Sequence, residues 1–211
     1  MKSSRRTIVK SMFAAAAITS MPMAWAADVV KIGYVSPQTG PLAPFGEADK
    51  WVIEQMKLAF KDGITIAGKK HEVQIILKDS QSNPNRAGEV ANDLILKDKV
   101  SLLLTAGTPE TSNPVSDVAE LNEIPCISSV VPWQPWFFGR KGDPAKGFNW
   151  TYHIFWGLED VIANFTNGWK SVQTNKKVGG LFPNDGDGNA WGDKELGFPK
   201  PLSQMGFTLT D

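Results

Sequence analysis

The stretch that decides the fold reads HEVQIILKDSQSNPNRAGEVANDLILKDKVSLLLT and covers residues 71–105. Its first part, residues 71–78, alternates apolar and polar side chains as a half-buried strand does. Asn83 and Pro84 then favour the start of a helix, because Asn caps free backbone amides and Pro suits the first helical turn. The mostly apolar residues 100–105 predict the next strand. A strand, a helix and a strand in this order indicate a right-handed crossover between parallel strands.

The same alternation continues on both sides of this unit. The expected strands cover residues 29–36, 71–78, 100–105, 124–129 and 151–155. The expected helices cover residues 46–61, 84–95 and 114–121. The last of them begins at Asn113 and Pro114, which repeat the cap-plus-proline pair. Strands separated by single helices predict an α/β fold with a doubly wound parallel sheet.

A sheet of this kind binds ligands at the edge formed by the carboxyl ends of its strands. Four expected loops lie on that edge, and they cover residues 37–45, 79–83, 106–112 and 130–138. In the first loop, Phe45 either offers its ring to a ligand or packs on its own helix. In the third, the side chains of Thr108, Glu110 and Thr111 precede a helix N-terminus, which could hold a carboxylate or carbonyl oxygen. Capping of that helix by Thr111 or Ser112 is the alternative and needs no ligand.

The fourth loop is rich in aromatic residues. It begins at Val130 and includes Trp133, Trp136, Phe137 and Phe138. We expect about 20 residues without regular structure here, which is unusual in a compact domain unless the loop binds or covers something. Aromatic rings suit apolar, aromatic or cationic ligands through stacking and cation–π attraction. The alternative is a small apolar core beneath the loop.

The composition narrows the function classes. The 211 residues include 22 basic and 22 acidic side chains. The chain therefore has no excess of positive charge of the kind that would indicate nucleic-acid binding. One cysteine excludes an internal disulfide and a multi-cysteine metal site, and two histidines offer little for a metal centre. We expect Cys126 and His153, both within strands, to be buried structural residues. The chain also lacks the nucleophile elbow, the phosphate-binding loop and the His-Glu-x-x-His motif, so we expect no enzyme, cofactor or metal.

The first 26 residues have the pattern of an export signal. Basic residues, among them Arg5 and Arg6, precede an Ala-rich apolar stretch that ends in Ala24-Trp25-Ala26. We therefore expect the mature chain to begin at Ala27 and the protein to be periplasmic. The adjacent arginines leave two export routes open, the twin-arginine route and the general secretory route.

Six short segments together carry a family resemblance. They are KIGYVS (31–36), TGPLAPFG (39–46), KDSQSNP (78–84), AGTPETSNPVS (106–116), IPCISS (124–129) and AWGD (190–193). In this order and spacing, they resemble the leucine/isoleucine/valine-binding family of type I periplasmic binding proteins, which serve ATP-driven importers. The resemblance implies two α/β lobes that clamp a ligand between them.

By that resemblance, residues 27–155 form the N-terminal ligand-binding lobe, and residues 156–211 begin a second lobe that is incomplete because family members are much longer. A helix is expected over residues 157–169 and a strand over 178–183. The loop 184–193 would then face the first lobe. In that loop, Trp191 occupies the place of an aromatic ligand contact in the family, as Phe45 does in the first lobe.

Two departures from the family concern the ligand. Pro109 and Pro132 stand where amino-acid binders carry a serine and a threonine, and proline has neither a hydroxyl group nor an amide hydrogen. Either neighbouring polar groups substitute, or the ligand is not an α-amino acid. We expect a ligand larger or more aromatic than leucine. The candidate ligand-binding residues are Phe45, Thr108, Glu110, Thr111, Val130, Trp133 and Trp191.

The function that follows is capture of a small molecule, an amino acid or an aromatic or amide-type compound. The protein, expected to be a monomer, would deliver it to the membrane permease of an ABC importer. The alternative is a ligand-sensing module of a signalling receptor, because both functions use this fold.

Overall fold

The structure is a computed structural model that describes residues 29–210. The export signal expected over residues 1–26 and the expected mature start at Ala27 lie outside the described residues. The strands are β1 (Val29–Ser36), β2 (Ile64–Ile66), β3 (Lys69–Asp79), β4 (Leu102–Ala106), β5 (Cys126–Ser129), β6 (Thr151–His153), β7 (Lys177–Gly179) and β8 (Thr208–Thr210). The helical elements are η1 (Ala43–Gly46), α2 (Asp49–Ala59), α3 (Pro84–Asp93), η2 (Leu94–Asp98), α4 (Pro109–Leu121), α5 (Trp133–Phe137), α6 (Leu158–Lys170), α7 (Gly186–Trp191) and α8 (Pro199–Gln204).

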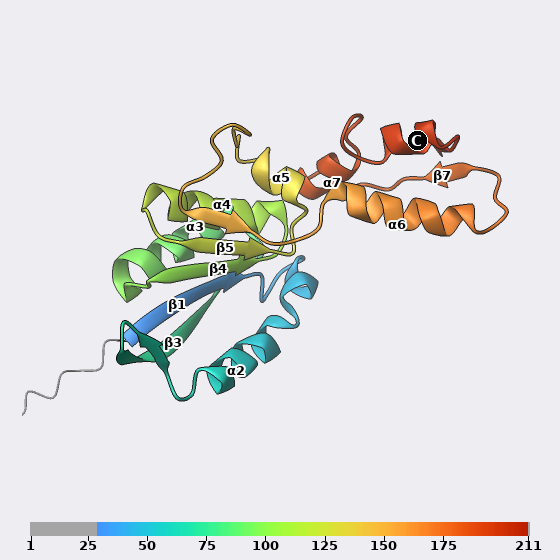
Figure 1. Ribbon diagram of the computed structural model, residues 1–211. Coiled ribbons are helices and arrows are strands. Elements are labelled where there is room, and N and C mark those ends of the chain that lie inside the picture. Colours follow the sequence, from blue (N-terminus) through green and yellow to red (C-terminus); the bar gives the residue numbers. More distant parts are fainter. Residues whose placement is uncertain (1–28, 211) are drawn as a thin grey trace, which may run out of the picture.

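A six-stranded sheet in the order β2-β3-β1-β4-β5-β6 forms the larger region. Helix α2 covers one face of this sheet, and α3 and α4 cover the other (Figure 1). This confirms the α/β, doubly wound architecture. The sheet is mixed rather than wholly parallel, because β2 pairs antiparallel with the amino-terminal end of β3. The turn between them, Ala67 and Gly68, has two positive φ angles, as a tight hairpin requires.

Buried apolar side chains fill both faces of the larger sheet. On the α3 and α4 face, Leu94, Leu103 and Cys126 are all 0% exposed. Burial raises the pKa of the Cys126 thiol to about 12, in accord with the expected inert, buried thiol. On the α2 face, Ile53 packs with Tyr34 and Ala106. These two layers hold the sheet edge, where the loops meet, in a fixed position.

The predicted start of α4 is wrong. The helix begins at Pro109, and Pro114 lies inside it. Pro109 supplies the favourable first position, and the carbonyl of Thr108 accepts hydrogen bonds from the amides of Thr111 and Ser112. The matching prediction at Asn83 is confirmed, because its side chain accepts a hydrogen bond from the Arg86 amide at 3.0 Å.

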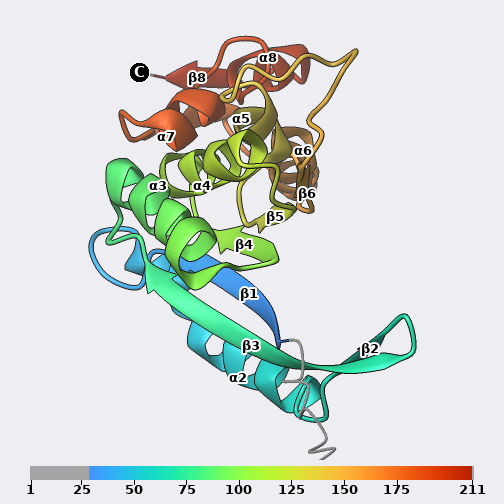
Figure 2. The same cartoon turned by 90° about the vertical axis from the view of Figure 1, so that its left-hand side faces the viewer.

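Residues 156–210 form a smaller region. Helix α6 confirms the expected helix over residues 157–169, and β7 pairs in parallel with β8 in a second, two-stranded sheet. Two segments expected to be loops contain short helices: α5 in the aromatic segment and α7 in residues 184–193. Asp185 caps α7 by accepting the Gly188 amide at 2.8 Å. In Figure 2, α7 lies beside α5, and α8 lies farther from the six-stranded sheet.

Across residues 29–210, no helix combines the length and apolar character needed to cross a membrane.

Candidate functional site

Asp79 ties two loops of the sheet edge together. Its carboxylate accepts hydrogen bonds from the backbone N–H groups of Gln38 at 2.9 Å and Gln81 at 2.7 Å, and from the Thr39 hydroxyl at 2.6 Å. Burial acts to raise the pKa of Asp79, but these hydrogen bonds outweigh it and hold that pKa below its ordinary value. The loop that carries Phe45 is therefore fixed to the loop after β3.

Phe45 and Val130 lie in different surroundings. Phe45 belongs to η1 and is 45% exposed. The carbonyl of its neighbour Gly46 accepts a hydrogen bond from the Gln38 side chain at 3.1 Å, which anchors this turn. Val130 has a left-handed backbone, with φ of 73°, and packs on the α2-side core beside Tyr34. Phe45 thus offers an accessible ring, whereas Val130 is a junction between strand and loop.

Thr108 and Thr111 are both buried at the start of α4, at 4% and 1% exposure. The Thr111 hydroxyl donates to the Thr108 carbonyl at 3.5 Å, a long bond across the first turn. The Thr108 hydroxyl has no hydrogen-bond partner within the part of the chain that the structure describes. Both side chains therefore pack inside the start of the helix, and their hydroxyl groups are not exposed at the surface.

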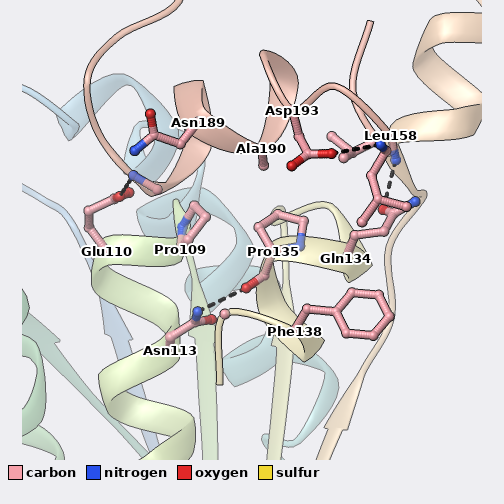
Figure 3. A pocket seen from close by; sticks show the side chains of 13 residues that line it. Pro109, Glu110, Asn113, Gln134, Pro135, Phe138, Leu158, Asn189, Ala190 and Asp193 are labelled. Atoms are coloured by element: carbon pink, nitrogen blue, oxygen red, sulfur yellow. Dashed lines mark hydrogen bonds between the residues drawn. The ribbon is translucent and has the colours of Figure 1, made fainter. Parts of the chain in front are cut away.

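A cavity of about 410 Å³ lies above this helix start, between α4, α5, α7 and the first residues of α6 (Figure 3). Its apolar walls come from Pro109, Pro135, Phe138, Gly139, Leu158, Gly186, Ala190 and Leu196. Its polar side chains are Glu110, Asn113, Gln134, Asn189 and Asp193. A mostly apolar lining with a few polar groups, and a volume of this size, is typical of sites for small molecules.

Two acceptor atoms at the cavity wall lack partners. Glu110 uses Oε1 to accept a hydrogen bond from the Gly186 amide of α7, which joins the two regions (Figure 3). Its Oε2 is buried and has no partner among residues 29–210. Asn113, one turn along α4, donates from Nδ2 to the Pro135 carbonyl at 3.1 Å, and its Oδ1 is also buried without a described partner.

The α7 side of the cavity is acidic. Burial raises the pKa of Asp187 above its ordinary value, and the negative charges of Asp185 and Glu110 raise it further. Three carboxyl groups therefore share one small volume at the start of α7. No cluster of His, Cys, Asp or Glu in the described ranges has the arrangement needed to hold a metal ion.

A second set of contacts joins α5 to the start of α6. Glu159 accepts hydrogen bonds from the Trp133 indole at 2.8 Å and from the Gln134 side chain. Gln134 in turn accepts the Leu158 amide at 2.9 Å. Burial acts to raise the pKa of Glu159, and the hydrogen bonds, that of Trp133 first, lower it below its ordinary value. Trp133 remains 37% exposed, so one face of its ring is open.

Trp191 closes α7 and packs into an aromatic group. Its ring centroid lies 5.7 Å from that of Phe198 and 6.5 Å from that of Trp156. Of the seven residues predicted from the sequence, Glu110 lies on the cavity wall, and the other six lie around the sheet edge and the aromatic group. Asn113 was not predicted as a site residue, because the expected helix began at residue 114, five residues after the observed start at Pro109.

Gln134, Phe138 and Leu158 were missed for another reason. They reach the cavity from α5 and α6, two helices that are distant from α4 in the sequence. A helical interpretation of residues 133–137 would have placed Gln134 and Phe138 one turn apart, and that is the signal that was available.

Comparisons with known proteins give one consistent result. A family model described as "Periplasmic binding protein" matches residues 29–199. No curated protein matches the chain.

Solved structures share the fold. The chain is similar to a solute-binding protein of an ABC transporter from Rhodopseudomonas palustris BisB5 in complex with 3,4-dihydroxybenzoic acid, at 24% identity and a TM-score of 0.64, over 86% of this chain and 46% of that one. It is similar to the leucine-binding protein LivK from Thermotoga maritima at 22% identity and a TM-score of 0.63, over 86% and 47%. It is also similar to the branched-chain amino acid transporter substrate-binding protein LivJ from Streptococcus pneumoniae in complex with isoleucine, at 21% identity and a TM-score of 0.54, over 72% and 41%. The chain thus spans less than half the length of each.

Proposed function

Because this chain belongs to the periplasmic binding protein family, we propose that it captures a small solute and delivers it to the permease of an ABC importer. The family consists of binding proteins rather than enzymes, in agreement with the missing catalytic motifs. The observation that carries the proposal is the cavity between α4, α5 and α7, which is built by both regions of the chain.

We propose that residues 27–155 act as the ligand-binding lobe and that residues 156–211 are the beginning of the second lobe. Several hydrogen bonds cross between them, among them Glu110 with the Gly186 amide, Glu159 with the Trp133 indole and Gln134 with the Leu158 amide. A solute that binds the closed arrangement of the two regions more tightly than the open one shifts the equilibrium toward the closed arrangement. The permease would then bind the surface that the closed arrangement presents.

The ligand class follows from two sources. The similar structures carry 3,4-dihydroxybenzoic acid or isoleucine, so an amino acid or an aromatic compound is the range to test. Pro109 and Pro132 cannot donate the hydroxyl contacts expected for an α-carboxylate, which supports a different polar contact in this chain. We assign that contact to the start of α4, with Phe45, Trp133 and Trp191 as aromatic neighbours of the solute.

A thermal-shift screen tests the function. The purified chain is heated with amino acids, aromatic acids, amides and polyamines, each at millimolar concentration. A ligand at 100 times its Kd stabilises the folded state by about 2.7 kcal/mol, so the true solute class raises the Tm by several degrees. If no compound of these classes raises the Tm, the proposal is wrong.

Trp133→Ala tests the aromatic contact with the best compound from that screen. Stacking contributes about 0.5–1.5 kcal/mol beyond area burial, so binding weakens several-fold in an isothermal titration. Trp51→Ala is the control, because that ring is 68% exposed on α2, whereas Trp133 starts α5 next to the cavity-lining residue Gln134. Equal affinity in both variants would remove Trp133 from the site.

Export to the periplasm is a separate proposal. Material from the periplasm begins at or within one or two residues of Ala27, which N-terminal sequencing measures. Replacement of Arg5 and Arg6 by lysine blocks export if the twin-arginine route is used and spares it if the general route is used. Periplasmic protein that still begins at Met1 would contradict the export signal.

A further inference from the structure

We propose that the cavity between α4, α5 and α7 takes a small organic ammonium ion, a protonated amine carried on an apolar or aromatic body. This inference rests on the proposed function and names the ligand class of the same site. A free amine and the amino group of an amino acid share this chemistry, and the test below separates them.

The unpartnered acceptors point to a donor. Glu110 Oε2 and Asn113 Oδ1 are both buried at the cavity wall with no hydrogen-bond partner in the described chain. A buried polar oxygen without a partner costs free energy, and a buried carboxylate oxygen costs more than a neutral one. Both oxygens can only accept, and an ammonium group offers three donors and a positive charge. An ammonium group in this cavity would offer hydrogen-bond donors and a positive charge on the side where Glu110 and Asn113 line the wall.

The charge around the cavity selects the same ligand. Among the described lining residues none is Lys, Arg or His, whereas Glu110 and Asp193 both contribute carboxyl groups. Asp185 and Asp187 add two further carboxyl groups at the start of α7. An anionic carboxylate would meet this field with no basic partner. The Gly186 amide at the start of α7 is already used by Glu110.

The remaining walls suit the body of the ligand. Pro109, Pro135 and Leu158 give an apolar surface, and Phe138 contributes a ring that is 43% exposed. An aromatic ring is a favourable neighbour for a cation. The volume of about 410 Å³ is at the lower end of the range for small-molecule sites, so a single-ring amine is the size to test.

Three probes with the same phenyl body test the inference on the whole chain. Phenethylamine carries the amine alone, phenylalanine carries amine and carboxylate, and 3-phenylpropionate carries the carboxylate alone. Isothermal titration should find binding of phenethylamine and at least tenfold weaker or no binding of 3-phenylpropionate. If phenethylamine binds and phenylalanine does not, the ligand is a free amine. If both bind, the ligand class also includes amino acids.

Glu110→Gln supplies the second arm. The variant keeps an oxygen that can accept the Gly186 amide but loses the charge, so phenethylamine binding should weaken at least tenfold. Glu54→Gln is the matched control, because that side chain is 65% exposed and lies on α2. Circular dichroism and the Tm of Glu110→Gln show whether the variant folds, and a folded variant with unchanged phenethylamine affinity overturns the inference.

The two proposals fail in different ways. Binding of 3-phenylpropionate that is equal to or tighter than that of phenethylamine, or binding of none of the three probes, overturns the ammonium inference. In either case a compound that raises the Tm in the thermal-shift screen leaves solute capture in place. If that screen finds nothing as well, both proposals are wrong.

Discussion

The two regions of the molecule differ in how much apolar surface they bury. Residues 29–155 contain a six-stranded sheet with a core on each face, where Leu103 and Leu94 are 0% exposed. Residues 156–210 contain a two-stranded sheet, and their buried apolar side chains are few: Leu158, Ile162, Leu202 and Phe207. The difference teaches that the first region carries its own stability, whereas the second depends on what packs against it.

The candidate cavity lies where the two regions meet. Its polar side chains come from both regions, with Glu110, Asn113 and Gln134 on α4 and α5, and Asn189 and Asp193 on α7 and the loop after it. A stable region that faces a less stable one is the arrangement expected when a ligand shifts the chain between an open and a closed state. Three measurements test whether the two regions differ in stability.

Core truncation should have the largest effect. Leu103→Ala removes a fully buried side chain from the first region and should lower the free energy of unfolding by about 2–5 kcal/mol. Leu181→Ala removes a side chain that is 97% exposed and should change it by less than about 0.5 kcal/mol. Urea unfolding followed by circular dichroism measures both. Similar losses in the two variants would mean that the regions are equally packed.

Limited proteolysis should show the next largest difference. Sites near Val172 and Leu181, which are 60% and 97% exposed, should be cut at least about tenfold faster than sites in the six-stranded sheet. The expected product is a core near residues 27–155, identified by mass spectrometry. Uniform protection through residue 210 would show that the second region is as stable as the first.

A half-buried histidine gives the smallest effect. His153 bonds Ser128 and the Val131 carbonyl, both at 2.8 Å, and lies against Trp136. Burial, helped by the nearby charge of Arg140, lowers the pKa of His153 below its ordinary value although the Val131 bond opposes it.

The sign of the resulting pH dependence follows from that pKa. Below the unfolded pKa of about 6.5, the unfolded chain binds a proton at His153 that the folded chain does not. Stability from this group is therefore complete above pH 6.5 and lost as the pH falls through the folded pKa. Between pH 6.5 and 5.5 the wild type should lose up to about 1.4 kcal/mol more than His153→Gln in urea unfolding. Parallel pH profiles would show that His153 does not titrate differently in the two states.

Local sequence patterns predicted the fold better than the site. The alternation over residues 71–105 predicted two strands and a helix because each depends on neighbouring residues alone. An Asn-Pro pair correctly predicted the helix start at residues 83–84. The second Asn-Pro pair, Asn113 and Pro114, gave a wrong start, because that helix already begins at Pro109. The three-residue strand β2 has too short a pattern to be recognised.

The site depends on contacts between distant segments. Glu110 was a candidate because acidic and hydroxyl groups at a helix start are visible in the sequence. Its link to Gly186, 76 residues away, and the approach of Leu158 to Gln134 are set by tertiary packing. No pattern over neighbouring residues contains that information.

Hydrogen–deuterium exchange tests the central claim, that one small solute binds between the two regions, most directly. The chain is measured with and without the compound that gives the largest rise in Tm. The account predicts slower exchange at the same time in residues 109–113, 134–139 and 186–193, which belong to both regions. Slower exchange confined to residues 29–155, or no change in residues 186–193, would contradict it.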